Sequence, residues 1–170
     1  MILPKVRDPR FTTLRRGGTL TDPHHHMLAL WAAQCAEHVL PRFERDQPQD
    51  LRPRAAIEAA RAWTRGELGM MQARQLAFGA NAAASPLKGA ARFAAYSAGQ
   101  AGAVGHVAAH YLGAAAYAIK AAGVAMPPPG REEAQRKECA WQRKRIPAEL
   151  RDLVLDDQRL RDKLCWGVFR

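Results

Sequence analysis

The sequence has few large apolar residues, few aromatic residues and, over its middle third, no acidic ones. No apolar run approaches the roughly 18 residues that a membrane-spanning helix needs. The opening segment MILPKVRDPRF has too short an apolar run for a signal peptide. The three cysteines, Cys35, Cys139 and Cys165, lack CxxC spacing, which favours reduced thiols. We therefore expect a cytoplasmic protein without a membrane segment.

The sequence motifs of the common catalytic sites are also missing. The chain has no P-loop, no dinucleotide fingerprint, no nucleophile elbow, no zinc-type cysteine array and no calcium loop. His106 and His110 are four residues apart, but HVAAH lacks the glutamate that serves as general base in HExxH. We therefore expect no catalysis and no cofactor.

What the chain does have is a long alanine- and glycine-rich stretch from Lys88 to Val124. Between residues 81 and 130 there is no Asp or Glu, and the only charged side chains are Lys88, Arg92 and Lys120. A helix that is small or apolar on nearly every face is usually buried. The composition predicts an all-α, single-domain helical bundle around this stretch. The stretch forms either one long helix, capped at Ser85–Pro86, or two stacked segments.

Residues 1–21 are expected to form an irregular arm before a helical domain at 22–170. Gly17–Gly18 predicts a turn, and its amides beside Arg15 and Arg16 can hold a phosphate or carboxylate. Asp22 and Pro23 suit the N-cap and first position of a helix. Its buried face is expected to contain Leu28, Trp31, Cys35 and Val39.

Proline and glycine residues indicate where the remaining helices begin and end. A helix begins near Pro53, and Gly66 and Gly69 are expected to divide it or to allow close packing. After the prolines at 127–129, charged helices run over 131–145 and from Pro147 onward. The adjacent Asp156 and Asp157 are expected at the surface. The apolar end CWGVF is expected to dock on the domain, and the last helix to be anchored by Leu150, Leu153, Val154, Leu160 and Leu164.

On a continuous helix, His106 and His110 share a face with Tyr96, Gly99, Ala103, Gly113 and Tyr117. Two imidazoles at this spacing can bind one metal ion. Two hydrogen-bonded core histidines are the more common arrangement. If a metal is bound, the candidate ligands are His26, His106, His110 and Glu58. Of His24, His25 and His26, we expect His26 to face inward and the other two to be exposed.

The net charge of +10 permits a nucleic acid or an acidic protein as a partner. The basic residues are mostly interleaved with acids, and aromatic residues do not alternate with basic ones as in a platform for single strands. Nucleic acid is therefore allowed but not favoured. The small-residue faces leave open whether helices pack within one chain or between two copies of a homo-oligomer.

Three strings, RFTTLRRGGTLTDPHHHMLALWAAQCAEHVL, RPRAAIEAARAWTRGE and AAYSAGQAGAVGHVAAHYLGAAAYAIKAA, together resemble the immunity proteins of bacterial polymorphic-toxin systems, in particular the all-helical "immunity protein five-like" family. The resemblance covers roughly residues 7–160. It implies a bacterial cytoplasmic protein that binds and neutralises a cognate toxin domain. The positions that match the pattern are Gly17, Gly18, His26, Trp31, Glu37, Arg52, Pro53, Arg54, Glu58, Trp63, Gly66, Glu67, His106, His110 and Tyr117.

Two other functions remain open from the residues alone. One is a metal-dependent or small-molecule-binding helical protein that uses the histidine stripe, and the other is non-specific nucleic-acid binding. The candidate binding residues are Arg15, Arg16, His26, Trp31, Glu58, Trp63, His106, His110 and Tyr117.

Overall fold

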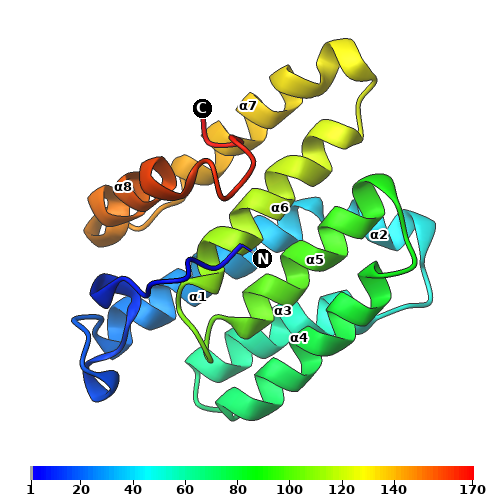
Figure 1. The fold of residues 1–170 in the computed structure, drawn as a ribbon. Coiled ribbons are helices and arrows are strands. Elements are labelled where there is room, and N and C mark those ends of the chain that lie inside the picture. Colours follow the sequence, from blue (N-terminus) through cyan, green and yellow to red (C-terminus); the bar gives the residue numbers. More distant parts are fainter. Residues whose placement is uncertain (1) are drawn as a thin grey trace.

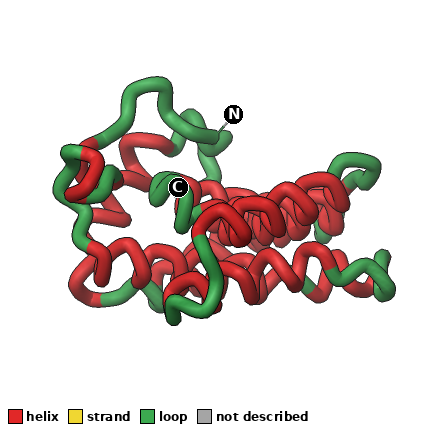
Figure 2. The backbone as a smooth tube through the Cα atoms, turned by 90° about the horizontal axis from the view of Figure 1, so that it is seen from below, coloured by secondary structure: helices red, strands yellow, loops and turns green. Residues whose placement is uncertain are grey.

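The computed structural model describes residues 2–170, and over this range it is all helical, as predicted. Its long helices lie nearly side by side, and the N-terminal arm folds over one end of them (Figures 1 and 2). None of the helices within residues 2–170 is long and apolar enough to cross a bilayer. The α-helices are α1 (Asp22–Val39), α2 (Pro41–Asp46), α3 (Arg52–Thr64), α4 (Met70–Ala84), α5 (Gly89–Ala103), α6 (His110–Val124), α7 (Arg131–Arg143) and α8 (Arg151–Arg161).

The alanine-rich stretch forms two helices, not one. Helices α5 and α6 pack against each other as an antiparallel pair and contribute most of the centre of the core (Figure 1). The chain turns at residues 104–109, where Gly105 lies against the Trp63 ring; a Cβ at Gly105 would come within 2.8 Å of it. At Gly102 a Cβ would meet the Ala56 carbonyl oxygen at 3.0 Å. The glycines thus permit both the bend and the close approach, and the small-residue faces are covered within one chain.

Helix α5 begins three residues later than predicted. Ser85 keeps a helical backbone (φ −53°, ψ −48°), and its N–H donates to the Asn81 carbonyl, so it closes α4 instead of capping α5. Helix α5 starts at Gly89. The division of the preceding helix at Gly66 and Gly69 is confirmed: Gly66 has φ +72°, and α3 and α4 end and begin on either side of it.

Helix α1 begins one residue earlier than predicted, because Thr21 and not Asp22 is its N-cap. The Thr21 hydroxyl accepts from the His24 N–H at 3.4 Å, and Asp22 and Pro23 occupy the first turn. The predicted buried face is confirmed, since Leu28, Trp31, Cys35 and Val39 are at most 2% exposed.

The arm before α1 contains two short 3₁₀ helices, Pro9–Phe11 and Leu14–Arg16, and a bridge between Thr13 and Leu20. Ile2, Phe11 and Leu20 are buried in the common core, so the arm packs on the helices.

The C-terminal segment docks as predicted, because Cys165, Val168 and Phe169 are buried. The anchors of the last helix are only partly as predicted. Leu150 and Val154 are buried and Leu153 packs against the core, whereas Leu160 and Leu164 are 56% and 37% exposed. Leu160 lies on the exposed side of α8, and Leu164 lies in the turn that follows the end of this helix at Arg161.

Candidate functional site

A cavity of about 720 Å³ lies between the arm and the end of the helix bundle where α5 turns into α6. We call it the arm pocket. Residues from the arm, α1, α3, the 104–109 turn and α8 line it. Five of the nine predicted binding residues lie in its wall: Arg15, Arg16, His26, Trp63 and His106.

The inner wall of the arm pocket is built around Trp63. The rings of His25 and His26 each meet the Trp63 ring edge-on, with centroids 4.8 Å away. Gly105 lies beneath the indole. Aromatic side chains offer a large apolar surface with specific geometry, so this wall is suited to a flat or apolar group.

The inward histidine is His25, not His26. His25 is 5% exposed, and its Nε2 lies 2.8 Å from the Val104 carbonyl oxygen at the end of α5. The prediction was wrong because His25, and not His26, precedes Leu28 and Ala29 by three and four residues and so shares their buried face. Burial lowers the pKa of His25. Its Nε2 donates to the carbonyl, because a carbonyl oxygen can only accept.

The rim of the pocket carries an excess of positive charge. Each lining carboxylate already has a guanidinium partner: Asp8 pairs with Arg10, Asp22 with Arg15, and Asp157 with Arg161. Within residues 2–170, the exposed Arg7 and Arg16 form no ion pair. The pocket is therefore suited to an acidic group.

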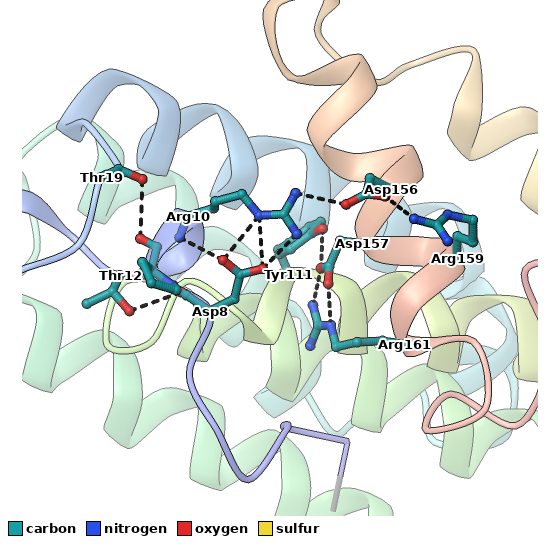
Figure 3. A network of polar contacts seen from close by, with 10 residues as sticks. Asp8, Arg10, Thr12, Thr19, Tyr111, Asp156, Asp157, Arg159 and Arg161 are labelled. Carbon is teal, nitrogen blue, oxygen red and sulfur yellow. Dashed lines mark hydrogen bonds and ion pairs between the residues drawn. The ribbon is translucent and has the colours of Figure 1, made fainter.

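The floor of the pocket is a buried polar network. The Arg161 Nε donates to Asp157 at 2.8 Å, and the Tyr111 hydroxyl donates to the same carboxylate at 2.6 Å (Figure 3). Arg161 also donates to the Ala109 carbonyl at 3.1 Å. The side chains of Arg161 and Asp157 are 7% and 4% exposed. Asp157 was expected at the surface; it is buried because α8 packs this face on Tyr111.

A second set of ion pairs fixes the arm to α8. Arg10 is held by Asp8 in its own turn and reaches Asp156 at 2.8 Å, and Asp156 also binds Arg159 (Figure 3). Arg10 lowers the pKa of Asp8 through their hydrogen bond. These contacts position the outer wall of the arm pocket.

His106 and His110 do not share a helix face. His106 lies in the turn and lines the pocket, whereas His110 is the first residue of α6. His110 Nδ1 is 2.8 Å from Gln100 Oε1, and Gly113 provides the space for this amide. Burial lowers the pKa of His110 to about 4, and burial followed by nearby arginines also lowers the pKa of His106. The prediction that the two histidines lie on one face of a continuous helix is therefore wrong.

The remaining candidate residues lie elsewhere. Trp31 is a core residue whose indole N–H donates to the Gln142 carbonyl at 3.0 Å. Glu58 is exposed and pairs with Arg61 at 2.6 Å, so it does not face the histidines. Tyr117 belongs to an aromatic cluster with Tyr96 and Trp166. No group of three or more His, Cys, Asp or Glu side chains within residues 2–170 is arranged to hold a metal ion.

Acidification is expected to destabilise the protein through His110. Its pKa is about 4 in the fold against an ordinary value of 6.5, so between these values the unfolded chain binds the proton and the fold does not. The free energy of unfolding should fall with pH below about 6.5, by up to about 1.4 kcal/mol per pH unit from this group. Denaturant unfolding between pH 7 and pH 4 measures the slope. The variant His110→Gln should have a shallower slope, and an unchanged slope would contradict this assignment.

Sequence reasoning missed Arg7, His25 and the Asp157–Arg161 pair. The spacing of His25 to Leu28 was an available signal. No local pattern marks Arg7 or Asp157. Arg7 reaches the arm pocket only because the arm folds over the bundle, and Asp157 is buried where it accepts a hydrogen bond from Tyr111 of α6.

Comparison with known protein families gives a match over most of the chain. The sequence model described as "Imm-5 like putative immunity protein" matches residues 18–149, a narrower range than the 7–160 expected from the resemblance. Trp63, His25, His26 and His106 fall within the match, whereas Arg7, Arg15, Arg16 and Arg161 fall outside it. No curated protein and no solved structure matches the chain. Because the matched range covers most of the sequence, the chain belongs to the Imm-5 like putative immunity protein family.

Proposed function

We propose that this protein is a cytoplasmic immunity protein that binds a cognate toxin domain and blocks it. Family membership supports the class of function. The arm pocket is the observation that supports the position of the binding surface. It is an aromatic cavity in which every lining carboxylate is paired, whereas Arg7 and Arg16 have no ion-pair partner among residues 2–170. The partner is then a protein that presents an acidic element to this end of the bundle.

This arrangement accounts for the basic character of the chain. Complementary charge steers association and selects partners, and an excess of Arg at the rim selects an acidic surface. Exposed Val6 and Leu14 stand on the arm next to these arginines, with exposed fractions of 83% and 61%. Apolar side chains beside charges are typical of an interface in which a central contact is surrounded by polar groups.

Co-expression tests the proposal. Bacteria that produce toxin domains encoded beside this gene should grow when the wild-type chain is also produced. The double variant Arg7→Glu/Arg16→Glu should bind the toxin about 100-fold more weakly and protect poorly, because both rim charges are reversed.

The matched control is Arg136→Glu/Lys137→Glu on α7, which makes the same change in net charge outside the arm pocket. It should protect as the wild type does. If the wild-type chain protects against none of these toxins, the immunity function is wrong. If the arm variant protects fully, the toxin binds another face.

A further inference from the structure

A second concave surface lies at the opposite end of the α5–α6 hairpin from the arm pocket. We call it the basic-aromatic patch. It takes residues from the start of α5, the second half of α6 and the C-terminal turn (Figure 1). Its lining is Lys88, Gly89, Arg92, Phe93, Tyr96, Tyr117, Lys120 and Trp166.

Four aromatic rings form the wall of the patch. Tyr117 is at its centre, with ring centroids 5.3 Å from Tyr96, 5.1 Å from Trp166 and 6.2 Å from Phe93. These rings come from three separate segments, at residues 93–96, 117 and 166, which is why the sequence shows no alternation of aromatic and basic residues.

The charges of the patch have one sign. Lys88, Arg92 and Lys120 are the only charged residues between positions 81 and 130, and no carboxylate of residues 2–170 lines the patch. Lys120 Nζ lies 4.2 Å from the Trp166 ring centroid, and the Arg92 guanidinium lies 5.5 Å from that of Tyr96. The N-terminus of α5 also opens here, and its cap residue Lys88 makes no side-chain capping bond. The free amides and the cations together favour an anion, and phosphate in particular.

The presentation of Trp166 is unusual. Its φ of +61° is the only positive value at a non-glycine position within residues 2–170. The neighbouring Cys165 and Val168 are buried, yet 45% of Trp166 is exposed. The turn is held by the Gly167 N–H, which donates to the Asp162 carbonyl at 2.8 Å. A strained backbone that displays an apolar ring to solvent is a feature of binding sites more than of cores.

We propose that the basic-aromatic patch binds single-stranded nucleic acid. A base stacks on the exposed ring of Trp166, while neighbouring phosphates contact Lys120, Arg92 and the end of α5 at Lys88. Aromatic rings interleaved with cations are the usual platform for single strands, because every base has a face that can stack. The carboxylates of an acidic peptide would pair with the cations but cannot stack on the aromatic rings.

Fluorescence anisotropy with a labelled short oligothymidylate tests the proposal across a range of salt concentrations. Contact with about three phosphates predicts a slope of about −2 for log affinity against log salt, because each single-strand phosphate contributes about −0.7. Arg92→Ala/Lys120→Ala should make this slope shallower by about 1.4, since it removes two of these contacts.

The stacking contact has a different signature. Trp166→Asn removes the ring but suits a left-handed backbone, so the turn should be retained. It should weaken binding about tenfold and leave the salt slope unchanged. Circular dichroism of each variant checks that the fold is intact.

Arg74→Ala/Phe78→Ala is a control for a cation and a ring outside the patch. It removes a cation and an exposed ring that lie 4.8 Å apart on α4, outside the patch. If this control weakens binding as much as the patch variants do, the affinity is due to overall charge and the proposal is overturned. A poly-glutamate peptide that binds the patch as tightly as the oligothymidylate would instead assign it to an acidic protein. Neither result bears on protection against a toxin, which the growth assay measures separately.

Discussion

Replacing Asp157 with alanine is expected to lower the free energy of unfolding by about 3–5 kcal/mol. The change leaves the guanidinium of Arg161, which is 7% exposed, buried without its partner. It also removes the acceptor of the Tyr111 hydroxyl, which is fully buried. A buried charge without a partner destabilises the fold far more than the intact ion pair stabilises it. Urea denaturation followed by circular dichroism at neutral pH measures the difference.

Two further variants separate this mechanism from a general effect of removing charge on α8. Asp156→Ala breaks the ion pairs to Arg10 and Arg159 on the exposed side of the same helix and should have a much smaller effect. Asp157→Leu/Arg161→Leu removes both buried charges and should be less destabilising than Asp157→Ala. Equal losses for the Asp156 and Asp157 variants would show that the buried network does not have this role.

Replacing Gly18 with alanine is expected to disrupt the arm and to cost about 3 kcal/mol. A Cβ at this position would lie 2.0 Å from the Thr12 carbonyl oxygen, a backbone atom that accepts the Leu20 N–H at 3.0 Å. The arm must therefore open, which exposes Phe11 and Leu20 and removes one wall of the arm pocket. Hydrogen exchange of residues 2–20 should show faster exchange than in the wild type.

The neighbouring glycine provides the control. Gly17 has φ +79°, and a Cβ added there would meet no atom of residues 2–170 within 4 Å, so its role is conformational and not steric. Gly17→Asn should be nearly neutral, because asparagine adopts the left-handed region more readily than other residues. If the arm of the Gly17 variant opens as much as that of the Gly18 variant, close packing on Thr12 is not what limits position 18.

The candidate site shows which inferences depend on distant contacts. Trp63 was a candidate from the family resemblance and His106 from its spacing to His110, but Arg7 was not a candidate, because nothing within the arm indicates that it faces the end of α5. The prediction that His106 and His110 share a helix face failed for the same reason. Helical periodicity relates His106 to His110 only if the helix continues, and the packing of Gly105 on Trp63 is a tertiary contact that ends it.

The sequence by itself determined the all-helical class, the buried face of α1, the break at Gly66 and the docking of the C-terminal residues. These features depend on periodicity, caps and composition, which act within a few residues of each other. Only the tertiary structure decided the burial of Asp157 and the two concave surfaces. The arm pocket joins residues 3 to 161, and the basic-aromatic patch joins residues 88 to 166. Burial and charge pairing at those distances are properties of the packed chain, because no local pattern specifies which surfaces meet.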